Sequence, residues 1–208
     1  MLEHDLRQRC SVPDRRGIAV LGEFIDLYPD IRITLLTTEE ELDLAMREAD
    51  VAIRLRQPTQ PDLIQRKLFS VHFHAYASPE YLKRFGTPLA FEQLDNHRLA
   101  VLGGTNIPIY LQNRNFLTEV GRNGKAPRTP HLMINNVLGL LRACQRGLAV
   151  ALLPDYLVEQ NPGLVQLLGE EQSPQLDAYF VYPEELKSVA RVQAFRDFLV
   201  SNAQRWSF

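Results

Sequence analysis

Residues 24–54, FIDLYPDIRITLLTTEEELDLAMREADVAIR, form the stretch that decides the fold. Apolar and polar side chains alternate over 31–36, which predicts a strand, and apolar residues then recur at helical spacing over 42–49. A capping box that begins at Thr38 fits the start of this helix. The short apolar run at 51–53 predicts a second strand, covered on both faces. Together these elements predict a βαβ unit and therefore a parallel sheet with a right-handed crossover.

A second strand, helix and strand unit is predicted over 134–154. Asn135 or Asn136 is placed to cap its helix, and Gly147 stands where a C-terminal glycine belongs. The run LAVALL then predicts a buried strand that Pro154 closes, parallel to the first by the same argument.

The remaining elements are predicted with less support from motifs. We expect helices over 18–28, from Ser78 to Gly86 and over 187–204, two strands at 63–68 and 71–77 that separate near Phe69-Ser70, and strand residues around Phe116 and Val120. Residues 1–16 are charged and aperiodic, and we expect a disordered or atypical tail.

Composition excludes several classes of protein. The 208 residues carry a net charge of −2 and give a pI near 6.2, so the chain lacks the basic footprint of a nucleic-acid-binding or membrane-surface protein. No apolar run reaches the roughly 18 residues that cross a bilayer, and the first residues lack the apolar centre of a secretory signal. We therefore expect a cytoplasmic protein without membrane partners, in which Cys10 and Cys144 stay reduced.

Neither catalysis nor cofactor binding is indicated. The sequence has no GxSxG, P-loop, GxGxxG or HExxH motif, so we expect no enzyme and no cofactor. His72 and His74 share one strand face and could chelate a metal, but no third ligand stands at a recognisable spacing. We expect a pair of strand histidines that face solvent or a cleft, and no metal site.

Six stretches together resemble one known family, the effector-binding (substrate-binding) domain of LysR-type transcriptional regulators. They are FIDLYPDIRITLL, DLAMREADVAIR, YASPEYLKRFGTP, NHRLAVL, LGLLRACQRGLAVALLPDYLV and VQAFRDFL, and they span about residues 18–205. The resemblance implies an α/β fold with two Rossmann-like subdomains in a periplasmic-binding-protein type II arrangement, joined by two crossover strands. Subdomain I would comprise 17–68 plus 184–208, and subdomain II would comprise 69–183.

The function that the resemblance implies is the sensing of a small anionic metabolite in the cleft between the subdomains, coupled to dimerisation. The family forms homodimers, and tetramers at full length. Here the helix over 39–48 and the strand over 31–36 would meet a partner chain. Promoter DNA would be bound only through an N-terminal winged helix-turn-helix, and no such segment precedes residue 17. The segment LRQRCSVPDRRG also stands where the family has an apolar strand, and it does not have the pattern of one.

Two other functions stay open. One is a stand-alone solute-binding protein of the periplasmic-binding type. The other is a dimerisation module with a vestigial cleft, which the unusual N-terminal segment favours.

Effector-binding residues are expected at strand and helix ends. Asn135, Asn136 and Val137 form a helix amino end suited to a carboxylate, or else the asparagine only caps the helix. Three more candidates leave a strand toward the same edge, where an arginine could pair with a carboxylate or remain a solvated loop charge. They are Arg54, Arg56 and Gln57.

The wall of the second subdomain supplies the last candidates. Leu102, Gly103 and Pro154 follow predicted strands and could line the cleft, or they could serve turn formation alone.

Overall fold

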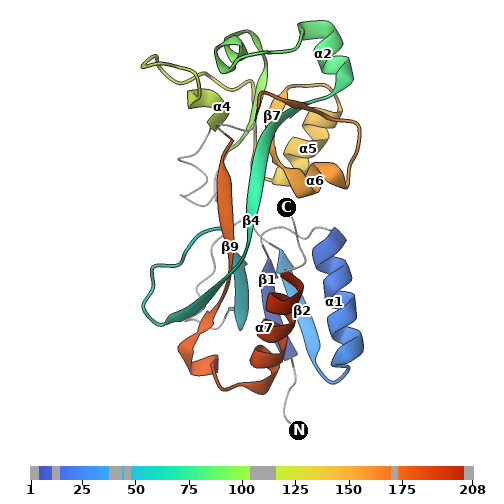
Figure 1. The fold of residues 1–208 in the computed structure, drawn as a ribbon, viewed down its shortest axis with the longest axis vertical. Coiled ribbons are helices and arrows are strands. Elements are labelled where there is room, and N and C mark those ends of the chain that lie inside the picture. The colour runs from blue at the N-terminus through green and yellow to red at the C-terminus, as the bar shows by residue number, and fades with distance from the viewer. Residues whose placement is uncertain are drawn as a thin grey trace. The chain divides into compact units, whose positions relative to one another are not determined.

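The computed structural model describes residues 5–10, 15–37, 44, 48–103, 116–169 and 173–203 (Figure 1). The chain divides into two compact units: unit 1 runs up to Val71 and resumes at Leu176, and unit 2 comprises His72–Gln175. The two boundaries predicted from the sequence lie at 68/69 and 183/184. Two strands, β4 (Leu63–Ala77) and β9 (Gln175–Pro183), carry the chain across the two boundaries.

Strand β4 is continuous, so the predicted break at Phe69-Ser70 is wrong. The polar Ser70 is accommodated within the strand because its hydroxyl donates to Asp177 Oδ1 of β9 at 2.7 Å. Lys67 Nζ lies 2.6 Å from the same carboxylate. Polar residues in this part of β4 therefore bind β9 instead of ending the strand.

Unit 1 is built on a sheet with the strand order β2-β1-β3-β9. Strand β1 is parallel to both β2 and β3, and β9 runs antiparallel to β3. The two strands predicted from the opening stretch are confirmed, although β1 lies between them, while the capping box and most of the predicted helix at 42–49 lie outside the described residues. The elements are β1 (Asp5–Cys10), helix α1 (Arg15–Leu27), β2 (Arg32–Thr37), β3 (Val51–Arg54), β9, the short helix η3 (Glu184–Leu186) and helix α7 (Ala190–Ala203).

Strand β1 corrects the expectation of an irregular tail over 1–16. It pairs in register along its whole length with β2, and Gln8 to Cys10 also pair with β3. A central strand is held by backbone hydrogen bonds on both sides, which any non-proline residue can make. The charged residues of this segment hide the strand from a search for apolar alternation.

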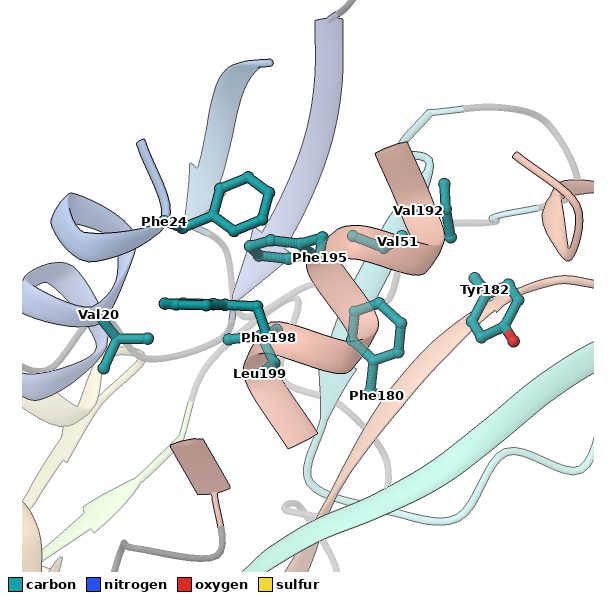
Figure 2. Packing of buried hydrophobic residues seen from close by; sticks show 9 residues of the cluster. All are labelled: Val20, Phe24, Val51, Phe180, Tyr182, Val192, Phe195, Phe198 and Leu199. Atoms are coloured by element: carbon teal, nitrogen blue, oxygen red, sulfur yellow. The ribbon is translucent and has the colours of Figure 1, made fainter. Parts of the chain in front are cut away.

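Helices from both parts of unit 1 cover one face of this sheet. The rings of Phe24 on α1 and Phe195 on α7 meet edge to face, with centroids 4.9 Å apart, and Phe198 lies 5.2 Å from Phe24 (Figure 2). The opposite face of β3 and β9 packs against Leu44 and Ala49. The helix predicted over 187–204 is confirmed as α7, and its apolar side chains belong to one core cluster. The cluster comprises Val20, Phe24, Val51, Phe180, Tyr182, Val192, Phe195, Phe198 and Leu199.

Unit 2 repeats the same strand arrangement. Its order is β6-β5-β7-β4, in which β5 is parallel to β6 and β7 while β4 runs antiparallel to β7 and also pairs with β8. The second predicted strand, helix and strand unit is confirmed. Besides β4, its elements are α2 (Pro79–Phe85), η1 (Phe91–Asn96), β5 (Leu99–Leu102), α4 (Phe116–Glu119), β6 (Leu132–Ile134), α5 (Val137–Gln145), β7 (Val150–Pro154), α6 (Asp155–Glu159) and β8 (Val165–Leu167).

The strand expected around Phe116 and Val120 is wrong, because this segment forms helix α4 and its following turn. Val120 N donates to Phe116 O at 2.8 Å, and both side chains pack against the core of unit 2. Residues four apart lie on one face of a helix, so a helical turn buries both. A strand would also place them on one face, which is why spacing alone did not decide between the two.

One buried arginine fixes the loop that follows α4. The Arg128 guanidinium donates to the backbone oxygens of Phe91, Leu117 and Val120 and to Asp95, and its side chain is 5% exposed. Every contact joins segments of unit 2. No helix in the described part of the chain is long and apolar enough to span a bilayer.

Candidate functional site

The carboxyl ends of three parallel strands meet at one edge of the unit 2 sheet. Leu102 ends β5 and is paired in register with Ile134, which ends β6, and Gly103 N donates to Ile134 O at 3.0 Å. Strand β7 runs parallel to β5 on its other side and ends at Pro154. In open α/β sheets this edge is where ligands bind.

Helix α5 begins at the same edge, directly after β6. Asn136 is its N-cap, and its side-chain oxygen accepts from Leu138 N at 2.9 Å and from Gly139 N at 3.1 Å. Asn136 therefore caps the helix, and its side-chain oxygen occupies two of the amides that could otherwise bind an anion. Its contact with an effector stays a prediction. Asn135 is exposed and Val137 is half-buried.

Two glycines shape the surroundings of this helix end. A Cβ at Gly139 would lie 2.6 Å from Ile134 Cγ2, so α5 approaches β6 as closely as only a glycine permits. A Cβ at Gly103 would lie 3.0 Å from the side chain of Met133. The predicted residues of unit 2, which are Leu102, Gly103, Asn135, Asn136, Val137 and Pro154, thus share one edge of the sheet.

A polar cluster that the sequence analysis did not select completes this edge. Asp155 directly follows Pro154, and both of its carboxylate oxygens lie 2.8 Å from His74 Nδ1. The Tyr76 hydroxyl donates to Asp155 Oδ1 at 2.9 Å. Because β4 is antiparallel to β7 and His74 pairs with Leu153, the cluster lies beside the carboxyl end of β7.

The cluster is largely buried. The side chain of His74 is 8% exposed and that of Asp155 is 21% exposed. Burial and, after it, the hydrogen bond to Asp155 raise the pKa of the Tyr76 hydroxyl well above its usual value near 10, so this hydroxyl keeps its proton and donates. The shared strand face of His74 and Tyr76 was visible in the sequence, but their partner on α6 was not.

The predicted residues of unit 1 follow β3. Arg54 is its last residue, is 8% exposed, and places Nη1 3.4 Å from Gln60 Oε1. The alternative of a solvated loop charge therefore does not apply to Arg54. Arg56 is half-buried and Gln57 is exposed in the bend that follows.

A pocket of about 190 Å³ in unit 1 does not involve any predicted residue. It lies at the amino end of β3, because Asp50 precedes that strand and Pro183 ends the antiparallel β9. Arg191 lines it, with Nη2 4.0 Å from Asp50 Oδ2. The predicted residues Arg54, Arg56 and Gln57 lie at the other end of the strand.

Metal ligands do not gather in the part of the chain that the structure describes. Over those ranges no three His, Cys, Asp or Glu side chains come together as a metal site. Cys144 is buried, its thiol donates to Tyr76 O at 3.2 Å, and burial raises its pKa to about 12. A thiol with this pKa stays protonated and is a poor ligand or nucleophile.

Comparison with known proteins gives consistent results. The model of the LysR substrate binding domain matches residues 11–204. The transcriptional regulator CrgA of Neisseria meningitidis serogroup C is 33% identical over 182 residues, which are 86% of this chain and 59% of that protein. A regulator of Xanthomonas campestris is 32% identical over 203 residues, which are 93% of this chain and 58% of that protein. The chain thus spans about three fifths of the length of these relatives.

Solved structures agree with the sequence relatives. The regulatory domain of Neisseria meningitidis CrgA superposes with a TM-score of 0.76 at 25% identity, over 96% of this chain and 98% of that one. The regulatory domain of Synechocystis CcmR, solved in complex with 2-PG, gives a TM-score of 0.78 at 17% identity, over 96% and 97% of the two chains. The predicted α/β fold class of periplasmic-binding-protein type II is confirmed.

Proposed function

Because this chain belongs to the family of LysR substrate binding domains, we propose that it is the effector-sensing and dimerisation domain of a LysR-type transcriptional regulator. The observation that carries the proposal is the match over residues 11–204, together with an edge of parallel strand ends in unit 2. The domain works in the cytoplasm, binds its effector reversibly and catalyses no reaction.

The effector is a small anionic metabolite. Each unit offers its own predicted contacts for such an effector: in unit 2 the edge formed by Leu102, Gly103, Asn135, Asn136, Val137 and Pro154, and in unit 1 the residues Arg54, Arg56 and Gln57. Two features support an anion. Helix α5 directs the positive end of its dipole to the edge of unit 2, and β3 of unit 1 ends at Arg54, with Arg56 in the bend that follows.

The alternatives have less support. The sequence relatives are transcriptional regulators, which does not favour a stand-alone solute-binding protein. The alternative of a dimerisation module with a vestigial cleft was based on the unusual N-terminal segment. Because part of that segment forms β1, which lies between β2 and β3 in the unit 1 sheet, this argument for the alternative no longer applies.

Association with a second copy is part of the proposal. Strand β2 is at the end of the strand order in unit 1, and β6 is at the end of the strand order in unit 2. Exposed apolar side chains precede β2 in the sequence, namely Ile25, Leu27 and Tyr28 at the end of α1, and others lie on β6 (Met133) and at the start of α5 (Leu138). In the family-wide scheme, an N-terminal winged helix-turn-helix of the longer protein binds promoter DNA.

A thermal-shift screen against small carboxylates tests the effector. A carboxylate at a hundred times its dissociation constant adds about 2.7 kcal/mol, which is a rise of several degrees in Tm. Arg56→Gln is expected to reduce the shift, whereas Arg146→Gln, a matched change at the exposed C-terminal end of α5, leaves it unchanged. If no carboxylate raises Tm, the proposed anionic effector is wrong.

Sedimentation at micromolar concentration tests the dimer. A mass corresponding to two copies is expected, and Leu138→Asp is expected to reduce it because it places a charge in an exposed apolar patch. Glu159→Gln changes an exposed charge in the same unit and serves as the control. A purely monomeric chain at this concentration contradicts the proposed association.

A further inference from the structure

The two nitrogens of the His74 ring have different surroundings. Nδ1 lies 2.8 Å from both oxygens of Asp155. An ionised carboxylate only accepts hydrogen bonds, so Nδ1 carries a proton and donates it. In the tautomer that this contact selects, Nε2 has a lone pair and is the acceptor of the ring. Within the described ranges, the polar contacts of the ring are those of Nδ1.

Tyr76 and Asp155 hold this ring in place. Asp155 accepts from both His74 and Tyr76, and its position at the start of α6 is fixed by the end of β7. The paired residues on β7, Leu153 and Ala151, are fully buried, so β4 cannot shift freely at this point. A ring whose second nitrogen is bound to a carboxylate keeps one tautomer and one orientation, as positioned histidines in binding sites do.

A buried pair of hydrogen-bonded, ionisable side chains often contributes no more to stability than apolar side chains of similar volume. A contribution to stability is therefore a weak reason for this cluster. The cluster nevertheless stands at the sheet edge that carries the six predicted residues of unit 2, directly after Pro154. Polar groups held in fixed orientation at such an edge are typical of ligand sites.

We propose that His74, positioned by Asp155 and Tyr76, recognises the effector through Nε2, and that the effector carries a hydroxyl group in addition to its anionic group. In the tautomer with the proton on Nδ1, Nε2 accepts a hydrogen bond from that hydroxyl, whereas a ligand without a donor group makes no hydrogen bond to Nε2. This inference rests on the proposed effector-binding function and narrows its ligand class from carboxylates to hydroxy acids.

Glycolate and acetate form a matched pair of probes, since they differ by a single hydroxyl. In ¹H–¹⁵N spectra of the histidine rings of the whole chain, glycolate is expected to shift the His74 Nε2 resonance and acetate is not. The ring of exposed His131, in the same unit, is the internal control and stays unchanged. This measurement uses the unmodified protein and does not depend on whether a variant folds.

Two variants extend the test. His74→Gln is expected to weaken glycolate binding about three- to tenfold, the range for one neutral hydrogen bond, and to leave acetate binding unchanged. Tyr76→Phe keeps the imidazole but removes one donor to Asp155, so the Nε2 response to glycolate is retained with a smaller amplitude.

The outcomes separate the two levels of the proposal. If glycolate shifts the backbone amides of Asn136 to Gly139 but not His74 Nε2, or if acetate shifts Nε2 equally, the role of His74 is wrong and the effector site stands. If neither probe shifts any resonance at this edge at millimolar concentration, both the hydroxy-acid inference and the anion site of unit 2 are overturned.

Discussion

Unit 1 and unit 2 place a parallel strand between two parallel neighbours and add one antiparallel strand, which gives β2-β1-β3-β9 in the first and β6-β5-β7-β4 in the second. Their interiors differ. Unit 1 packs aromatic rings from helices at opposite ends of the chain, α1 and α7. Unit 2 is a continuous segment. Among the side chains that the structure describes, five of the six buried polar residues lie in unit 2, and the sixth is Arg54 in unit 1. Those five are His74, Ser78, His97, Thr118 and Arg128.

This difference shows that one sheet order can be stabilised in two ways. Apolar burial holds two distant chain segments together in unit 1 without directional contacts. In unit 2 hydrogen bonds fix loops and helix ends in defined positions, which is what a binding edge requires. Hydrogen exchange resolved by peptide can follow the two units separately, since protection reports local as well as global opening.

The largest expected effect is on the aromatic core of unit 1. Phe195→Ala removes a fully buried ring and is expected to cost about 3–5 kcal/mol. Urea denaturation and hydrogen exchange would show the loss of protection in α1 and α7. Ile25→Ala, at a half-exposed position on α1, is the control and should cost less than about 1 kcal/mol. A small effect of Phe195→Ala would mean that the ends of the chain are not joined by this cluster.

The next effect concerns the polar contacts of unit 2. Arg128→Met leaves three backbone oxygens without this donor and leaves Asp95 with Arg122 alone, and we expect a loss of about 2–4 kcal/mol in stability. Arg122→Met removes the other arginine on Asp95, whose contact is near the surface, and should cost less than about 1 kcal/mol. Equal losses for the two variants in urea denaturation would contradict the structural role assigned to Arg128.

Two glycine substitutions are expected to act in opposite directions. Gly139→Ala puts a methyl group 2.6 Å from Ile134 Cγ2 and should destabilise unit 2 by about 1–3 kcal/mol. Gly22→Ala on α1 meets no atom within 4 Å, so it should stabilise unit 1 by up to about 1 kcal/mol through helix propensity. The midpoints of urea denaturation compare them. A midpoint of Gly139→Ala at or above that of the parent chain would refute the close packing of α5 on β6, and a lowered midpoint of Gly22→Ala would refute the prediction for α1.

The smallest effect is a pH dependence in unit 2. Burial lowers the pKa of the His97 imidazole, which lies 3.3 Å from the Tyr81 hydroxyl. The unfolded chain therefore binds a proton more readily than the folded one. The contribution of His97 to the free energy of unfolding is therefore fully present above the pKa of the unfolded chain, near 6.5. It declines as pH falls toward the pKa of the folded chain, by at most about 1.4 kcal/mol per pH unit. Hydrogen exchange of unit 2 between pH 7.5 and 5.5 should show this decline, and His97→Gln should reduce it. An unchanged slope in that variant would assign the decline to other groups.

Much of the fold could be predicted because it depends on local patterns. The strand at β2, the helix α1, the Ser78 cap of α2 and the Asn136 cap of α5 each follow from residues within a few positions of one another. Alternation, helical spacing and capping operate over these short distances. Phe116 and Val120 are four residues apart, and this spacing places both side chains on one face of either a helix or a strand. The local pattern therefore could not decide between the two for this segment.

The candidate site was predictable only in part. Residues at strand and helix ends, such as Gly103 and Asn136, follow from the order of elements. His74 and Asp155 are 81 positions apart, and no pattern in the sequence indicates that they are hydrogen-bonded. Their contact depends on the antiparallel register of β4 and β7, which is a property of the folded sheet.

The sequence by itself determined the strand-helix-strand unit of unit 2, the strands β2 and β3, the amino ends of α2 and α5, and the likeness to LysR substrate binding domains, because periodicity and capping are encoded within short segments. Only the tertiary structure decided that β1 is a central strand, that α7 packs on α1, and that His74, Tyr76 and Asp155 form one cluster. These features join segments distant along the chain. Which of these segments pack together depends on which backbones and side chains can be buried against one another in the folded chain. A local sequence pattern does not contain this information.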